Sequence, residues 1–232
     1  PASRNRAANG RPEPLRPMRI FGIKPTYAIC RFICQWVCTL YIRSRCFGLR
    51  HVPREGPVLL VCNHQSFMDP VLAGISLHRE ASFMARDTMF RHPLFGRLLH
   101  RLNAFPVRRG TADIGAIKES LRRLKQGHVL VVFPEGTRTP DGRIKDMLPG
   151  LGTIAKKARI PIVPTLIDGM QHAWPRARLL PHPGDVVVEY GPALWPEEYA
   201  DLSVDELMNL LRARLMEMQS RWRSRRRPSY LQ

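Results

Sequence analysis

One stretch decides the fold of this chain: Val61-Cys62-Asn63-His64-Gln65-Ser66-Phe67-Met68-Asp69-Pro70. The apolar run that leads into it, residues 57–62, predicts a buried strand. Asp69-Pro70 predicts a helix N-cap followed by the proline favoured at the first helical position. On a regular helix the side chains of His64 and Asp69 would lie about 140° apart, so they can face each other only across a turn. The stretch therefore predicts a strand, a polar turn and a helix.

The side chains of His64 and Asp69 are a candidate general-base pair. A neutral imidazole whose second nitrogen is held by a carboxylate can accept a proton near neutral pH. Open α/β sheets place their sites at the carboxyl ends of strands, which is where this turn would lie. The alternative interpretation is structural, with His64 a hydrogen-bonded loop residue and Asp69 only a helix cap. The rest of the chain decides between the two.

Strands and helices alternate along the remaining sequence. Apolar runs predict strands at residues 83–85, 128–133, 160–167 and 185–190, and helical periodicity or capping predicts helices at residues 71–77, 112–126, 153–158 and from Ser203 onward. Pro161 and Pro164 suggest that residues 160–167 form an edge strand or a strand end. This alternation predicts an α/β fold with a mostly parallel central sheet and helices on both faces.

The charge of the 232-residue chain indicates an anionic partner surface. Lys and Arg number 37 against 19 Asp and Glu, giving a net charge of +18. Residues 1–17 and the arginine run Arg221 to Arg227 carry part of this charge, and the body carries the rest. Such a distribution suits nucleic acid or an anionic membrane leaflet.

The five cysteines, an odd number without a secretory signal pattern, indicate a reducing compartment. Cys30, Cys34 and Cys38 stand four residues apart, which lines them along one side of a helix. That spacing is not typical of a metal-cluster loop, and cysteine is also a small hydrophobe. We therefore expect no metal site.

Residues 27–42 predict a helix that lies in the membrane interface. They are mostly apolar with a narrow polar stripe at Arg31, Gln35 and Thr39. At about sixteen residues the segment is shorter than the roughly twenty that a bilayer span needs. A membrane span lengthened at its start and a buried core helix are the alternatives. Residues 91–102, which mix basic and apolar side chains, are a second candidate for membrane contact or a solvated basic face.

Two more polar turns follow apolar runs, at residues 104–110 and 133–138. A parallel sheet would bring them to the same edge as the His64 turn. There a base, a carboxylate and several arginines could surround one anionic substrate, because arginine grips phosphate with two parallel hydrogen bonds.

These turns resemble the motifs of the glycerolipid acyltransferase family, the 1-acylglycerol-3-phosphate acyltransferases and their relatives. The first motif, Asn-His and four residues later Asp, is matched at Asn63-His64 and Asp69. The third, Phe-Pro-Glu-Gly-Thr-Arg, is matched without change at residues 133–138. The second, an apolar run closing in arginine, fits residues 105–109.

Two details bound the resemblance. Asn103 stands where the second motif would have glycine, although asparagine tolerates a left-handed backbone. A fourth, proline-rich strand motif is matched at residues 161–164. The resemblance covers about residues 53–169 of the chain.

The resemblance implies that the chain transfers a fatty acyl chain from acyl-CoA or acyl carrier protein (acyl-ACP) to the free hydroxyl of a lysophospholipid. The default acceptor of the family is 1-acylglycerol-3-phosphate, which would give phosphatidate. His64, oriented by Asp69, would take the hydroxyl proton, and no bound cofactor is expected. The residues expected to bind the acceptor or shape its pocket are Arg109, Glu135, Gly136, Thr137, Arg138 and Pro161.

The chain thus divides into four expected segments. They are a disordered basic segment (1–17), a membrane-associated helix region (18–48), an acyltransferase domain (49–220) and a basic tail (221–232). Met18, just before the first structured segment, predicts a start near that point. We expect the protein on the cytoplasmic face of an anionic membrane, peripheral or monotopic, with one membrane span as the alternative.

Other functions stay open on the sequence. The acceptor could be another lysolipid, for example a lyso-aminolipid. A nucleic-acid-binding module is supported by charge alone, so no nucleic-acid partner is expected. A membrane protein that keeps the fold without turnover is a third class. A serine hydrolase using Ser66 is disfavoured, because Ser66 lacks the Gly-x-Ser-x-Gly elbow.

Overall fold

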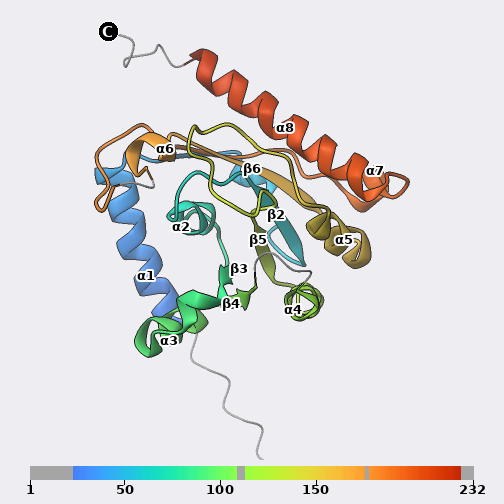
Figure 1. The fold of residues 1–232 in the computed structure, drawn as a ribbon, viewed down its shortest axis with the longest axis horizontal. Helices are drawn as coiled ribbons and strands as arrows, with labels where there is room; N and C mark the ends of the chain where they lie inside the picture. The colour runs from blue at the N-terminus through green and yellow to red at the C-terminus, as the bar shows by residue number, and fades with distance from the viewer. Residues whose placement is uncertain (1–22, 109–112, 176–177, 226–232) are drawn as a thin grey trace, which may run out of the picture.

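The structure, a computed structural model, describes residues 23–108, 113–175 and 178–225. Its centre is a sheet with the strand order β1-β7-β6-β2-β5-β3-β4. The strands are β1 (Arg45–Phe47), β2 (Val58–Cys62), β3 (Ala81–Arg86), β4 (Ala104–Val107), β5 (Val129–Val132), β6 (Ile162–Asp168) and β7 (Val187–Tyr190). Figure 1 shows the helices arranged around this sheet.

The helices follow the caps and periodicities of the sequence. Asp113 caps α4 by accepting a hydrogen bond from the Ala116 N–H group, and Ser203 and Glu206 form a reciprocal capping box at the start of α8. The helices are α1 (Pro25–Trp36), α2 (Asp69–Ile75), α3 (Pro93–Arg101), α4 (Ile114–Lys125), α5 (Pro149–Ala158), α6 (Met170–Ala173), α7 (Pro196–Tyr199) and α8 (Val204–Arg225).

The direction of the strands brings three strand ends together. Strands β6, β2, β5, β3 and β4 run parallel to one another, while β7 pairs antiparallel with β6 and β1 pairs parallel with β7. The prediction of a mostly parallel sheet is confirmed. Because β6, β2 and β5 are neighbours, the segments that follow Asp168, Cys62 and Val132 meet at one edge of the sheet.

The sheet has an apolar core on each face. Leu60 of β2 packs among side chains from α1, α2 and α6, whereas its neighbours Leu59 and Val61 pack with side chains from α4, α5 and α8. Successive strand residues point to opposite faces, so a sheet covered on both sides needs strands that are apolar throughout. Both β2 and β5 are buried at every position. The prediction of helices on both faces is therefore confirmed.

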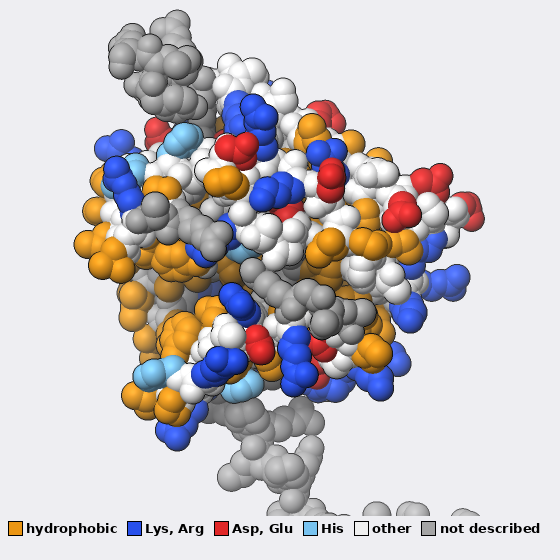
Figure 2. Space-filling view, in the orientation of Figure 1, with side chains coloured by type: hydrophobic (Ala, Val, Ile, Leu, Met, Phe, Trp, Pro, Cys, Tyr) orange, Lys and Arg blue, Asp and Glu red, His pale blue; other side chains and the backbone are white. Residues whose placement is uncertain are grey.

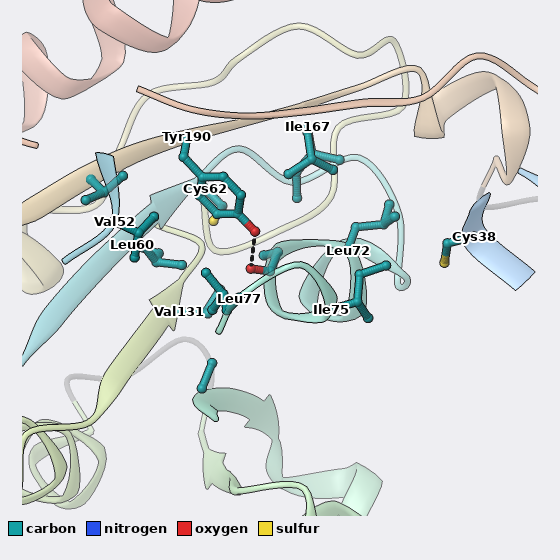
Figure 3. Packing of buried hydrophobic residues seen from close by; sticks show 14 of the residues in the cluster. Cys38, Val52, Leu60, Cys62, Leu72, Ile75, Leu77, Val131, Ile167 and Tyr190 are labelled. Atoms are coloured by element: carbon teal, nitrogen blue, oxygen red, sulfur yellow. Dashed lines mark hydrogen bonds between the residues drawn. The ribbon is translucent and has the colours of Figure 1, made fainter. Parts of the chain in front are cut away.

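Helix α2 is fixed against the sheet by the first of these cores (Figure 3). Leu60 and Leu72 are fully buried there, and full burial of such a side chain contributes about 1.5–3 kcal/mol. The hydroxyl of Tyr190 donates a hydrogen bond of 2.9 Å to the carbonyl of Ala73 in α2. Burial raises the pKa of Tyr190 well above its ordinary value. The helix that begins at Asp69 thus has a set position.

The sequence predicts an edge strand or a strand end for Pro161 and Pro164, and the interior position of β6 excludes the first alternative, while Pro161 directly precedes the strand. Strand β6 lies between β7 and β2, so Pro164 is not in an edge strand. A central strand tolerates this proline because it faces β7 just beyond their ladder, which begins at the pair Thr165 and Tyr190. No N–H donor is needed there, and the Pro164 carbonyl still accepts a hydrogen bond from Gly191 N at 2.8 Å.

The N-terminal helix α1, which continues as a π-helical turn at Val37–Tyr41, has two different sides. One side is buried on the body through Tyr27, Cys38 and Ile42. The other side carries large apolar residues that are each more than half exposed: Ile29, Phe32, Ile33, Trp36 and Leu40. Figure 2 shows hydrophobic side chains along the side of the molecule where Figure 1 draws α1.

Two further observations concern this region. In the part of the chain that the structure describes, no helix combines the length and the apolar character that crossing a membrane requires. Strand β1 falls inside residues 18–48, which the sequence assigns to a helical region, and it joins the sheet through β7. The sheet therefore begins before residue 49.

Candidate active site

The turn after β2 closes around one carboxylate oxygen. His64 Nδ1 lies 2.8 Å from Asp69 Oδ2, and the same oxygen accepts hydrogen bonds from Gln65 N at 2.5 Å and Ser66 N at 2.7 Å. The carboxylate holds the imidazole with its Nδ1–H group, so the lone pair for accepting a proton resides on Nε2. The turn that the sequence predicts brings His64 and Asp69 together.

Asp69 is removed from water. Its side chain is fully buried, and Oδ1 has no hydrogen-bond partner among the described residues. Burial raises the pKa of Asp69, while the bonds from His64 and the two backbone N–H groups oppose that rise. A buried carboxylate next to an imidazole stabilises the imidazolium that forms when His64 takes up a proton.

Asn63 anchors the turn to the neighbouring strand. Its Nδ2 donates to the carbonyl of Ile167 and its Oδ1 accepts from Ile167 N, both at 2.8 Å. The side-chain amide thus replaces a backbone peptide group in pairing with β6. The backbone that leads into His64 is consequently fixed at the end of the sheet.

Glu135, from the turn after β5, binds the backbone of the His64 turn. Its Oε1 accepts a hydrogen bond of 2.9 Å from His64 N, and its Oε2 accepts one of 3.3 Å from Lys145 N. The ring of Phe133 lies against the imidazole, with 4.4 Å between the ring centres. Burial raises the pKa of Glu135 to about 7. Both oxygens of this predicted substrate-binding residue are therefore engaged by backbone groups.

The rest of the residue 133–138 turn continues from Glu135 to Thr139, and both of these residues bond to the backbone of His64. Gly136 has a φ of 66°, and a Cβ atom there would come within 2.9 Å of Leu148 Cδ1, so the position favours glycine. Thr137 is exposed and Arg138 is half-buried. Thr139 N donates to the His64 carbonyl at 2.8 Å, which ties this turn to the first one.

Of the two remaining predicted site residues, the structure describes only Pro161. Arg109 lies outside the described residues. The carbonyl of Pro161 accepts a hydrogen bond from Leu59 N at the amino-terminal end of β2. His64 follows Leu59 by five residues, about 16 Å along a strand, so Pro161 lies at the opposite edge of the sheet. There it borders an open groove with Pro53, Pro57 and Trp195.

Ser66 makes a bond that does not suit a nucleophile. Its side chain is buried, and its hydroxyl donates to the carbonyl of Trp174 at 3.2 Å. A serine nucleophile would instead donate its hydroxyl to the imidazole. This geometry argues against the serine-hydrolase alternative.

Sequence reasoning missed several polar residues around the turn. Gln65, Asp168, Gln219 and Arg223 form one hydrogen-bonded group behind His64. The sequence did contain a signal for Asp168, because this polar residue stands at the end of an apolar strand, as the polar residues of the His64 turn do. The two α8 residues carry no such signal, since their partner lies about fifty residues away in the chain.

The α/β fold and the buried His64–Asp69 pair at a strand end can now be compared with known protein families. Residues 43–168, more than half of the chain, match the family described as Acyltransferase, and the chain belongs to that family.

Relatives narrow the comparison. A chloroplastic 1-acyl-sn-glycerol-3-phosphate acyltransferase of Brassica napus is 32% identical over 167 residues, covering 70% of this chain and 48% of that protein. The enzyme of the same name from Cocos nucifera is 29% identical, covering 67% and 51%. The one from Bacillus subtilis is 26% identical, covering 62% and 71%. The chain thus spans about half the length of the two plant relatives.

The fold also matches a solved structure. The crystal structure of the 1-acyl-sn-glycerophosphate acyltransferase PlsC from Thermotoga maritima superimposes with a TM-score of 0.73 at 24% identity. The match covers 87% of this chain and 80% of that one, so the two share their fold over most of their length.

Proposed function

We propose that the protein is a membrane-bound acyltransferase that moves a fatty acyl chain from a thioester to the free hydroxyl of 1-acylglycerol-3-phosphate. The observation that carries the proposal is the 2.8 Å contact between His64 Nδ1 and the buried Asp69, at a strand end of a chain in the acyltransferase family. The plant and Bacillus relatives bear the name of this activity, which supports the choice of acceptor.

The reaction follows from the imidazole geometry. His64 Nε2 removes the proton of the acceptor hydroxyl as its oxygen attacks the thioester carbonyl carbon. The tetrahedral intermediate then collapses, the carbon–sulfur bond breaks, and the thiolate takes the proton from the imidazolium. The products are an ester and a free thiol, with no acyl-enzyme. Asp69 keeps the imidazole oriented and offsets its positive charge in the charged state.

The acceptor phosphate would meet the turns next to His64. Thr137 is exposed and Arg138 is half-buried, and with Arg109 they would supply hydrogen bonds and positive charge. Glu135 and Gly136 act in this proposal by shaping the turn, because the Glu135 oxygens accept backbone N–H groups and Gly136 has a left-handed backbone.

The proposed membrane contact uses the exposed apolar side of α1. This side suits the boundary between headgroups and acyl chains, and the +18 net charge favours an anionic cytoplasmic leaflet. Replacing Phe32, Trp36 and Leu40 by serine should release the protein from anionic vesicles while leaving the buried side of α1 intact. Cosedimentation with vesicles measures this, and full retention of the variant would contradict the contact.

The test of the activity is thiol release by the purified protein in anionic vesicles. Acyl-CoA and acyl-ACP are used in separate arms, each with lysophosphatidate and a panel of other lysolipids, a lyso-aminolipid among them. We expect release with lysophosphatidate, and His64→Ala should lower the rate about a hundredfold or more while the fold is retained. Absence of release with both donors and all acceptors, or an unchanged rate in the variant, would overturn the proposal.

A further inference from the structure

The end of helix α8 is bound to the body of the protein by two ion pairs. Arg221 Nη2 lies 2.8 Å from Glu189 of β7, and Arg223 Nη2 lies 2.8 Å from Asp168 of β6. Both arginines belong to the basic run that the sequence assigns to a tail for an anionic surface. These two instead have protein carboxylates as partners, and only one of those carboxylates leads to the His64 turn.

One carboxylate oxygen of Asp168 accepts hydrogen bonds from three side chains. Its side chain is almost fully buried, and Oδ1 accepts from Arg223 Nη2 at 2.8 Å, from Gln219 Nε2 at 3.2 Å and from Gln65 Nε2 at 3.2 Å. A buried carboxylate is costly unless a cation and further hydrogen bonds satisfy it. Arg223 and Gln219 therefore help to fix the Asp168 carboxylate at the place where it accepts from Gln65 Nε2.

The carbonyl of Gly142 is a second meeting point for the same groups. It accepts from Gln219 Nε2 at 2.8 Å, Arg223 Nη2 at 2.9 Å and Gln65 Nε2 at 3.4 Å. Gly142 has a φ of 73°, and a Cβ atom there would come within 2.9 Å of Arg223 Nη2. The loop that contains Gly142 is thus packed tightly against the end of α8.

Gln65 connects this network to the proposed base. Its Oε1 accepts backbone N–H groups of Gly169 at 3.2 Å and Met170 at 3.1 Å, so its side chain is held at both ends. Its own backbone N–H donates to Asp69 Oδ2, the oxygen that holds the His64 ring. A shift of Gln65 would move a donor of that carboxylate.

We propose that Gln219 and Arg223 are positioning residues for the His64–Asp69 pair. They act through Asp168 and the Gly142 carbonyl on Gln65, whose backbone N–H group donates to Asp69 Oδ2. The role rests on the proposed acyl transfer, because its kinetic readout is that reaction. Small displacements of a reacting group strongly lower the rate of a reaction that depends on positioning.

The chain offers a matched control. Arg221 and Arg223 stand two residues apart, make ion pairs of the same length, and have side chains that are 40% and 36% exposed. Glu189, the partner of Arg221, also accepts a hydrogen bond from Trp222, a residue of α8 itself. Arg221→Gln therefore removes an ion pair of the same length that does not lead to His64, whereas Arg223→Gln also removes a donor to the Gly142 carbonyl.

The kinetic test uses the full-length protein in zwitterionic micelles, where attraction to anionic lipid does not contribute. Arg223→Gln should lower kcat about tenfold or more with KM for donor and acceptor nearly unchanged. Arg221→Gln should keep the wild-type kcat, and Arg223→Lys, which keeps the charge without the planar fork, should recover part of it. Equal kcat values for Arg223→Gln and Arg221→Gln would overturn the proposal.

A second readout does not depend on turnover. The imidazole NMR resonances of His64 should shift in Arg223→Gln and stay as in the wild type in Arg221→Gln. If the wild-type protein transfers no acyl chain, the proposed function fails, and these resonances still test the network. If Arg223→Gln does not fold, Gln219→Leu replaces it, because this change removes the other α8 donor to Asp168 and to the Gly142 carbonyl. A His64 spectrum identical to the wild type together with full activity in that variant would refute the positioning role.

Discussion

Two polar clusters at opposite edges of the sheet handle their charges differently. At the amino-terminal edge, Arg123 bonds to Glu119, to Ser82 Oγ and to the carbonyl of Asn103. Arg122 and Arg123 lower the pKa of the Glu119 carboxyl to about 2. At the carboxyl-terminal edge, burial raises the pKa of Glu135 to about 7.

The difference teaches which polar cluster is structural and which is a candidate site. In the Arg123 cluster, the Glu119 carboxylate is paired with two cations, Arg122 and Arg123, so the cluster stabilises the fold directly. The His64 cluster buries its two carboxylates, Asp69 and Glu135, with Asp69 Oδ1 left without a hydrogen bond in the described structure. Groups held at such an energetic cost are typical of functional sites. Variants in each cluster can test this contrast, because kcat and the free energy of unfolding can be measured separately.

The largest expected effect is on turnover in Asp69→Asn. Asparagine keeps one acceptor oxygen for the Gln65 and Ser66 N–H groups but loses the charge that offsets the imidazolium. We expect kcat to fall about a hundredfold or more, with little change in the free energy of unfolding, because a buried charge is removed as well. Thiol-release kinetics and urea denaturation measure the two quantities. If Asp69→Asn had the kcat of the wild type, Asp69 would be a structural residue and not part of the catalytic pair.

The next effect is on the pH dependence of stability and involves Glu135. Its carboxyl has a pKa of about 7 in the folded protein against an ordinary 4.5. Between these pH values the folded state keeps a proton that the unfolded state has released, so stability falls as pH rises through this window. The shift corresponds to about 3 kcal/mol.

The measurement is urea denaturation of the wild type and Glu135→Gln at intervals from pH 4.5 to pH 7.5. Glutamine does not titrate, so the decline seen in the wild type should be absent from the variant at this position. Parallel stability curves for the two proteins would show that Glu135 does not store this energy.

The smallest effect is expected for Arg123→Gln at the other edge. The variant leaves the Asn103 carbonyl without its cationic donor and Glu119 with only one of its two arginine partners, Arg122, which should lower the free energy of unfolding by about 1–3 kcal/mol. Since these groups lie away from the His64 turn, kcat of the folded variant should equal that of the wild type. A selective loss of kcat, with stability unchanged, would reverse the contrast between the edges.

The sequence predicts what local pattern encodes. Strand β2 and the turn after it are readable because the apolar run, the polar residues and Asp69-Pro70 are contiguous. Strand β1 has three exposed residues and no apolar run, so nothing local announces it. The antiparallel direction of β7 and the central place of Pro164 depend on strand pairing, which the local pattern does not contain.

The candidate site divides in the same way. His64 and Asp69 are five residues apart, and the structure places them in contact. Glu135 was expected to bind substrate, but its backbone partners depend on how two strand ends meet. Arg223 and Asp168 are 55 residues apart, and a basic run reads as a solvated tail until its partners are known.

The three hydrogen bonds on Asp69 Oδ2 make the formation of the turn and the orientation of the base one event. His64, Gln65 and Ser66 all depend on that oxygen, so a molecule whose turn is open has no oriented imidazole. Amide hydrogen exchange at Gln65 and Ser66 would therefore count the molecules that are ready to react. In a preparation of this protein, slow exchange at two backbone positions would serve as an active-site titration that needs no substrate.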